Sequence, residues 1–186
     1  MDRKIKILSF AGSLRKGSYN KALLNAAVEL APENVEIEVF DLEGIPLFNQ
    51  DLELHPPRIV KEFKEKIKSA DALLIVTPEY NYSMSGVIKN ALDVASRPPT
   101  DKIFTGKPVA IMSASPSRFG GARAQYQLRQ ILIVLNAHPI NLPEIMLSQA
   151  DKNVDENGKI NNEGTRKLIR ELLEELTSWT KKIEKK

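Results

Sequence analysis

The sequence predicts a doubly wound α/β fold, in which helices cover both faces of a five-stranded parallel sheet. Strand-like and helix-like segments alternate along all 186 residues, with no repeat, low-complexity tract or domain-sized linker between them. Three of the strand candidates are short, nearly continuous apolar runs, which is typical of parallel strands buried on both faces. A chain of this length fits one core, so we expect residues 1–186 to fold as a single domain.

The predicted elements follow one another in strict alternation. Apolar runs predict strands at 5–10, 35–40, 72–77 and 109–113, and a last strand near 139–146. The spacing of apolar residues predicts helices at 21–30, 58–69, 85–96, 122–135 and 165–182. Right-handed crossovers bring the loops after the first, third and fourth strands to the C-terminal edge of the sheet. Open α/β sheets bind their ligands at that edge.

Composition and charge exclude several classes of protein. Lys and Arg outnumber Asp and Glu by only 27 to 24, and many alternate with Glu, as in KEFKEK at 61–66. Such faces are typical of solvated helices, so we expect no nucleic-acid partner. The absence of cysteine excludes disulfides, thiol catalysis and cysteine metal sites. The N-terminus lacks a signal-peptide core and no segment has membrane-spanning length, so we expect a cytoplasmic protein without a membrane partner.

The most informative segment is GSLRKGSYN at residues 12–20, between the first strand and the first helix. Backbone N–H groups and the positive end of the helix dipole converge at such a turn. Ser13, Ser18 and Asn20 add small polar donors and Arg15 adds a guanidinium, all suited to phosphate oxygens. The segment matches neither the nucleoside-triphosphate loop nor the G-x-G-x-x-G turn of dinucleotide folds. It predicts a site for a terminal monophosphate held without a metal; the alternative is a polar turn that only starts the helix.

The loop after the third strand, PEYNYSMSG at residues 78–86, predicts a wall for a planar ring. Its two tyrosines and asparagine form a flat, partly polar surface of the kind that a heteroaromatic ring needs. The alternative is a surface turn whose tyrosines pack locally.

The loop after the fourth strand, SASPSRFGG at 113–121, offers hydroxyls, flexible glycine backbone and Arg118, a candidate for an incoming phosphate. A flexible loop that only starts the next helix explains this segment equally well.

With these three loops, the chain resembles the NADPH-dependent FMN reductase family of flavodoxin-like proteins, which includes bacterial quinone and chromate reductases. The resemblance covers nearly the whole chain and rests on GSLRKGSYN, PEYNYS, GVIKNALD at 86–93 and GGARAQYQLR at 120–129. It implies the flavodoxin-like sheet order 2-1-3-4-5, with FMN at the switch point between strands one and three. The segment 116–118 is more polar and bulkier than the glycine-containing loop common in that family.

The resemblance also implies which residues contact the cofactor. The first motif is expected to hold the FMN phosphate, the second to lie along the isoalloxazine ring, and the loop after strand four to meet the ring edge. The implied FMN-binding residues are Ser13, Arg15, Ser18, Tyr19 and Asn20, then Pro78, Glu79, Tyr80, Asn81 and Tyr82, and finally Ser115 and Ser117.

The function implied is that of an FMN-dependent NAD(P)H oxidoreductase. NADPH or NADH passes a hydride to N5 of FMN, and a quinone or similar acceptor then receives the electrons, with chromate, azo compounds and free flavin as further acceptors. No protein residue is expected to act as catalyst, since FMN carries the difficult chemistry. No metal site is expected. The alternatives are a flavodoxin-type electron carrier and a non-catalytic FMN-binding protein.

Two further expectations concern histidines and assembly. His55 and His138 each precede proline in loop contexts and are expected to be surface or packing residues. The helix at 122–135 ends in five consecutive apolar residues, which one helix face cannot bury, so we expect a homodimer or homotetramer. Arg123, Tyr126 and Glu144 resemble an inter-subunit hydrogen-bond network of the family, with an ordinary helix surface or an intrachain pair as the alternative.

Overall fold

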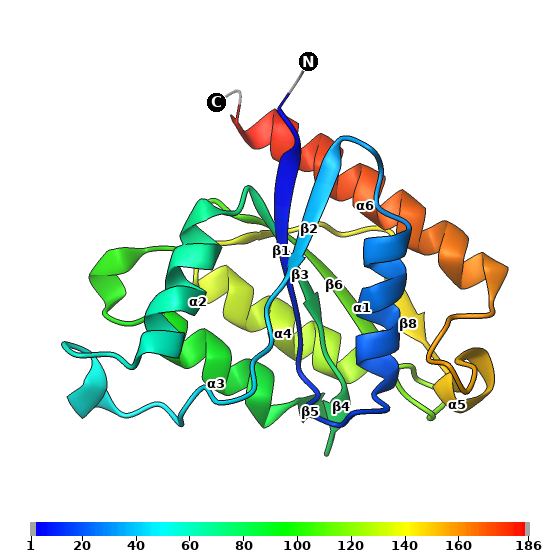
Figure 1. Ribbon diagram of the computed structural model, residues 1–186, viewed down its shortest axis with the longest axis horizontal. Helices are drawn as coiled ribbons and strands as arrows, with labels where there is room; N and C mark the ends of the chain where they lie inside the picture. The colour runs from blue at the N-terminus through cyan, green and yellow to red at the C-terminus, as the bar shows by residue number, and fades with distance from the viewer. Residues whose placement is uncertain (1–2, 185–186) are drawn as a thin grey trace.

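The computed structural model describes residues 3–184 as a parallel sheet with helices on both faces (Figure 1). The main strands are β1 (Ile5–Ala11), β2 (Val35–Val39), β3 (Ala72–Val76) and β6 (Pro108–Ala114). The two short strands β7 (His138–Pro139) and β8 (Ile145–Leu147) both pair with β6. Every pair in this sheet is parallel, and the order is β2-β1-β3-β6 followed by β7 and β8. The predicted order 2-1-3-4-5 is thereby confirmed.

The single strand predicted near 139–146 is wrong in detail, because two short strands take its place. Pro108 and Val109 at the start of β6 pair with β7, whereas Met112 to Ala114 at its end pair with β8. The segment between β7 and β8 contains Pro143, which has no N–H to donate to a ladder.

The helices form two layers, one on each face of the sheet. The helices α2 (Arg58–Ser69), α3 (Gly86–Ala95) and α4 (Ala122–Val134) cover one face, and α1 (Tyr19–Glu29) and α6 (Glu163–Glu184) cover the other. Three short helical pieces also occur: η1 (Gln50–Leu52), η2 (Pro99–Asp101) and α5 (Ala150–Asn153). The five predicted helices agree with the observed ones to within two residues at each end.

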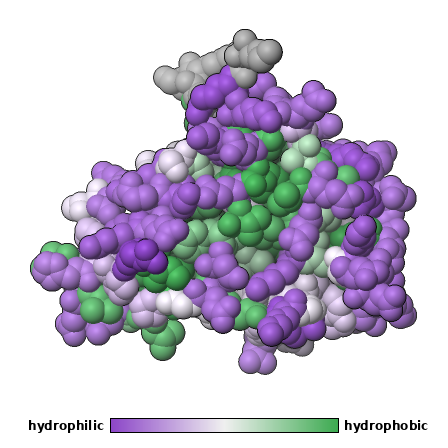
Figure 2. Space-filling model, viewed as in Figure 1, coloured by the Kyte–Doolittle hydropathy of each residue, from purple (hydrophilic) through white to green (hydrophobic). Residues whose placement is uncertain are grey.

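The core consists of two apolar clusters separated by the sheet. All five residues of β3 and all seven of β6 are buried, as expected for strands with helices on both sides. The edge strand β2 is more exposed, and Figure 2 shows an apolar strip over β1 and β2 between hydrophilic borders. Among residues 3–184, no helix has both the length and the apolar character that crossing a membrane requires.

Candidate functional site

The C-terminal ends of β1, β3 and β6 carry the three loops singled out by their sequence. Because these strands are parallel neighbours, their following loops emerge at one edge of the sheet (Figure 1). The turn at residues 12–18, a hairpin at 79–84 and the loop 115–121 therefore lie around the same edge, at the switch point between β1 and β3.

The turn at 12–18 presents backbone donors that the rest of the described chain leaves unused. Within residues 3–184, none of the N–H groups of residues 13–17 donates a hydrogen bond to a protein acceptor. Ser13 is only 4% exposed, and its hydroxyl also has no partner in this part of the chain. Residues 14–17 are exposed, so their donors are open to a ligand, and a run of unpaired N–H groups ahead of a helix N-terminus suits an anion.

Two residues at the start of α1 hold the turn in place. The Ser18 hydroxyl accepts from the N–H groups of Asn20 and Lys21, at 3.2 and 3.3 Å, which leaves its own proton free to donate. The Asn20 side chain forms two hydrogen bonds with Ala114 at the end of β6: Nδ2 donates to the carbonyl at 3.0 Å, and Oδ1 accepts from the N–H at 2.9 Å. Asn20 therefore fastens the turn to the loop after β6, and one amide hydrogen remains for a ligand.

The N-terminal end of α3 packs directly against the turn. Gly12 lies so close that an added Cβ would be 2.4 Å from both Ser85 Oγ and Ile88 Cγ1. Ser85 is the N-cap of α3, since its hydroxyl accepts from the Ile88 N–H at 3.2 Å. Only glycine permits this approach, and two helix N-termini, those of α1 and α3, thus lie beside the same turn.

The predicted ring-facing segment is an antiparallel hairpin, β4 (Glu79–Tyr80) and β5 (Ser83–Met84). Its two turn residues, Asn81 and Tyr82, have φ of 50° and 65°, as a type I′ turn requires. This left-handed conformation costs a residue other than glycine roughly 1–2 kcal/mol. Tyr80 and Tyr82 are 55% and 67% exposed, so both rings are available at the edge of the site.

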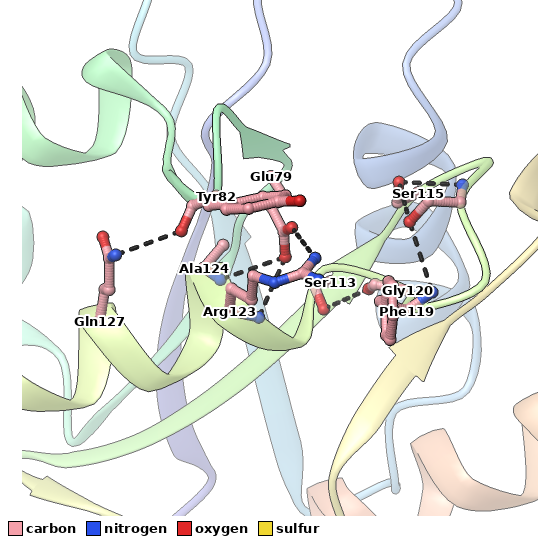
Figure 3. Close-up of polar contacts among 10 residues, drawn as sticks. Glu79, Tyr82, Ser113, Ser115, Phe119, Gly120, Arg123, Ala124 and Gln127 are labelled. Carbon is pink, nitrogen blue, oxygen red and sulfur yellow. Dashed lines mark hydrogen bonds and ion pairs between the residues drawn. The ribbon is translucent and has the colours of Figure 1, made fainter.

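Glu79 does not face the edge but caps a helix. Its carboxylate accepts from the N–H groups of Arg123 and Ala124, at 3.0 and 3.4 Å, and from Arg123 Nη1 at 3.0 Å (Figure 3). The N-cap residue of α4, Gly121, has no side chain to do this. Glu79 therefore supplies the cap from another segment and attaches the hairpin to α4.

Arg123 connects the hairpin with the loop after β6. Figure 3 shows its guanidinium between the rings of Tyr82 and Phe119, whose centroids lie 4.0 and 4.3 Å from Cζ. A cation over an aromatic face contributes roughly 0.5–2 kcal/mol, comparable with the cost of the left-handed Tyr82. From the sequence, Arg123 was a candidate for a contact between subunits or for an ordinary helix surface or intrachain pair; within the chain it forms an ion pair with Glu79.

The loop 115–121 is rigidly supported from beneath. The Ser113 hydroxyl donates to the Gly120 carbonyl at 2.6 Å, and Gln125 Nε2 donates to Ser113 Oγ at 2.8 Å. Gly120 and Gly121 have φ of 59° and 91°, and a Cβ on either would lie within 2.6 Å of a neighbour. Ser115 and Ser117 hydrogen-bond to one another at 3.1 Å. The loop therefore has a defined shape, and Ser117 lies exposed on it.

The structure brings the predicted residues together in three groups. Ser13, Ser18 and Asn20 are buried at the turn, while Arg15 is exposed, with its guanidinium 5.1 Å from the Tyr19 ring centroid. Pro78 is buried behind the hairpin.

Sequence reasoning did not foresee the contribution of Gly12, Phe119 or Gln125 to the shape of the site. A glycine at a strand end and a polar residue at an apolar helix position were the available signals.

The arrangement suits a phosphate-bearing planar ligand. The unused N–H groups of 13–17, the free hydroxyl protons and Arg15 match a phosphate dianion, and the tyrosine rings beside them match a flat ring. These residues fit FMN. His55 and His138 are both exposed, away from the three loops, and residues 3–184 contain no group of three His, Asp or Glu with metal-binding geometry.

Comparisons with known proteins agree with this geometry. Residues 5–152 match the family model described as NADPH-dependent FMN reductase. An NAD(P)H-dependent FMN reductase of Pseudomonas aeruginosa is 50% identical over 184 residues, covering 98% of this chain and 99% of the relative. An NAD(P)H:quinone oxidoreductase of Solanum tuberosum is 43% identical, with 98% and 96% covered. The solved structure of FerB, a flavoenzyme NAD(P)H:(acceptor) oxidoreductase from Paracoccus denitrificans, superposes with a TM-score of 0.88 at 32% identity, covering 96% of this chain and 98% of FerB.

Proposed function

The chain belongs to the NADPH-dependent FMN reductase family, and on that premise we propose that it is a quinone reductase that uses FMN and NAD(P)H. The observation that carries the proposal is the run of unused N–H donors at 13–17, next to the N-termini of α1 and α3. Bound there, FMN supplies the hydride acceptor and electron donor that no protein side chain provides. The protein's part is to bind, orient and shield the cofactor. The whole chain, 1–186, acts as a single FMN-binding domain.

We assign the phosphate to the N–H groups of 13–17 with the hydroxyls of Ser13 and Ser18. Arg15 lies at the exposed side of the turn, where its guanidinium adds charge-assisted hydrogen bonds, and the half-buried Tyr19 ring lies beside it. Asn20 contributes its remaining amide hydrogen, and its larger task is to hold the turn on β6.

The isoalloxazine ring is assigned to the space between the hairpin and the loop after β6. Tyr80, Asn81 and Tyr82 present exposed polar and aromatic groups there, and Ser115 and Ser117 lie on the opposite loop. Pro78 and Glu79 act indirectly in this assignment, because Pro78 is buried and Glu79 is bound to α4.

The test is anaerobic titration of the FMN-loaded protein with NADPH and, separately, NADH, with flavin absorbance as the readout. Bleaching by reduced nicotinamide, followed by recovery on addition of a quinone, is expected. A flavin that stays oxidised with both nucleotides but exchanges electrons with a redox protein would instead identify an electron carrier. A flavin that is inert to both donors would identify a non-catalytic FMN-binding protein.

Assembly into a homodimer, doubled to a homotetramer, is part of the proposal. At the end of α4, Leu132 is fully buried, but Ile133 and Val134 are 69% and 85% exposed. Tyr126, on the same helix, is 52% exposed. A partner subunit would cover these exposed side chains. The tetramer contact is proposed to involve Arg123, Tyr126 and Glu144, with Arg123 still paired with Glu79 of its own chain.

Light scattering tests the assembly, since a lone chain has a mass of 20.8 kDa. Val134→Asp is expected to lower the measured mass, whereas Leu54→Asp, at an equally exposed position (85%), is expected to leave it unchanged. A monomeric wild type, or equal losses from both variants, would contradict assembly through α4. We also propose a cytoplasmic location, which fractionation of the source cells tests.

A further inference from the structure

We propose that Arg123 is a positioning residue that couples the hairpin 79–84 to the loop 115–121, so that the two sides of the flavin site keep a fixed spacing. The inference rests on the proposed function for its role in turnover, but its structural content concerns only this chain's own residues.

The first arm of the coupling is polar. Arg123 Nη1 donates to Glu79 Oε1 at 3.0 Å, while the backbone N–H of Arg123 donates to Glu79 Oε2 at 3.0 Å. The Glu79 side chain is only 9% exposed, and the Arg123 side chain is 35% exposed. One residue thus holds the hairpin through both its backbone and its side chain, in a partly buried place where solvent screens the pair less than at an open surface.

The second arm is aromatic. The Arg123 guanidinium lies over both the Tyr82 ring and the Phe119 ring, with Cζ 4.0 and 4.3 Å from their centroids. Tyr82 belongs to the hairpin turn and Phe119 to the loop after β6, so this stack joins segments that follow different strands (Figure 3). A lysine ammonium is a compact point charge without a plane that can lie against a ring, so arginine is better suited to the position.

Within residues 3–184, no hydrogen bond joins the hairpin 79–84 to the loop 115–121. Gln127 holds the hairpin to α4 by accepting from the Ser83 hydroxyl and donating to the Tyr82 carbonyl, but it does not reach the other loop. Ser113 and Gln125 hold the loop to the sheet from beneath, and the hydrogen bonds of their side chains go to Gly120, Ile145 and each other. Among residues 3–184, only the Arg123 guanidinium lies over the rings of both Tyr82 and Phe119, which are 67% and 43% exposed.

Hydrogen exchange on the FMN-free protein tests the coupling directly. Arg123→Ala should raise amide exchange in both 79–84 and 115–121 by about tenfold, the size expected for losing an ion pair and two ring contacts. Arg123→Lys keeps a cation near Glu79 but loses the ring contacts. It should therefore raise amide exchange in 115–121 by about three- to tenfold while the ion pair with Glu79 is kept. The matched control is Arg58→Ala, which removes an exposed guanidinium without a ring or carboxylate partner in the described chain.

A double-mutant cycle separates coupling from local damage. Phe119→Ala should raise exchange in the remote hairpin when Arg123 is present and add nothing when Arg123 is alanine. Additive effects of the two substitutions would overturn the proposal, as would loosening of only one segment by Arg123→Ala. If Arg123→Ala does not fold, the lysine variant and Phe119→Ala still decide the matter.

Kinetics of the FMN-loaded enzyme give the functional readout. Arg123→Lys should raise KM for the quinone by about three- to tenfold with kcat changed by less than about twofold, because a loosened wall weakens binding without altering the hydride transfer. Equal KM values in Arg123→Lys and wild type would remove the role in turnover. An inactive wild-type enzyme would contradict the proposed function while leaving the exchange result to decide the coupling.

Discussion

Substituting Gly12 tests whether the end of α3 shapes the phosphate turn. In Gly12→Ala the new Cβ would meet Ser85 Oγ and Ile88 Cγ1 at 2.4 Å, far inside van der Waals contact. Overpacking of this kind costs about 1–3 kcal/mol. Rotating the Ser85 hydroxyl away would also release the Ile88 N–H that it caps, which costs about 1 kcal/mol more. We expect a total loss of unfolding free energy of about 2–4 kcal/mol.

The assay is urea and thermal unfolding of the FMN-free protein, with FMN titration of the same samples. For a domain of this size, each kcal/mol shifts Tm by about 2–4 °C, so Tm should fall by about 4–16 °C. The chain provides a matched control, since a Cβ on Gly86, at the first residue of α3, would meet nothing within 4 Å. Gly86→Ala should be neutral or stabilise by up to about 1 kcal/mol, because alanine has less unfolded-state entropy to lose.

Unfolding and FMN affinity should change together in Gly12→Ala. We expect Gly12→Ala to weaken FMN as well as the fold, since α3 must retreat from the turn, whereas Gly86→Ala should bind FMN as the wild type does. A Gly12→Ala protein with wild-type Tm and wild-type FMN affinity would refute the packing of α3 on the turn. An equal loss of Tm and FMN affinity in Gly86→Ala would show that the start of α3 tolerates no added side chain. The contact of residue 12 with Ser85 and Ile88 would then not be the cause.

Three further predictions concern affinity, pH and kinetics. Arg15→Ala should weaken FMN by ~1.5–3 kcal/mol, about one to two decades in Kd, but leave riboflavin binding unchanged in fluorescence titrations; an equal loss for riboflavin would contradict the phosphate assignment. Lys64 holds the pKa of the Asp101 carboxyl below its ordinary value of 3.8, so this pair stabilises the fold above that value and loses its effect as pH falls. Asp101→Asn should therefore unfold at lower urea than wild type at neutral pH, and the difference should shrink as pH falls below 3.8; a constant difference would refute the linkage. Double-reciprocal plots at several quinone concentrations should be parallel, and intersecting lines would contradict the use of one flavin face by both substrates in turn. His55→Ala and His138→Ala should each keep activity within about tenfold, ~1.4 kcal/mol of barrier. A larger loss in either variant would reveal a catalytic histidine.

The sequence predicted most of the fold because its strands are short and apolar and its helices are regular. The parallel runs in β1, β3 and β6 leave little ambiguity about a sheet buried on both sides. The hairpin at 79–84 was missed because its turn is Asn81-Tyr82, and tyrosine gives no signal for a left-handed conformation. The last predicted strand is divided into β7 and β8, which pair with the start and the end of β6. Which parts of β6 are free for pairing depends on the tertiary structure, and no local sequence pattern contains this information.

The three loops lie at one edge of the sheet, as predicted, but the direction of their side chains was beyond the sequence. Glu79 and Asn20 are polar residues next to a predicted ligand, and both instead bond to protein backbone, at α4 and at Ala114. Which of two nearby acceptors a polar side chain chooses depends on distances across the assembled fold. Arg123 illustrates the same limit, because a residue 44 positions away completes its ion pair.

The double hydrogen bond between Asn20 and Ala114 also bears on the order of folding. It joins residues separated by 94 positions, so the turn reaches its final shape only after β6 has docked beside β3. Local helix formation in α1 can precede this, but closing so long a loop carries an entropic cost that the sheet must first offset. We therefore expect the cofactor site to form late in folding. Since FMN would bind the finished turn and not the open chain, cofactor in excess should stabilise the native state by mass action, and cells short of flavin would hold a less stable protein.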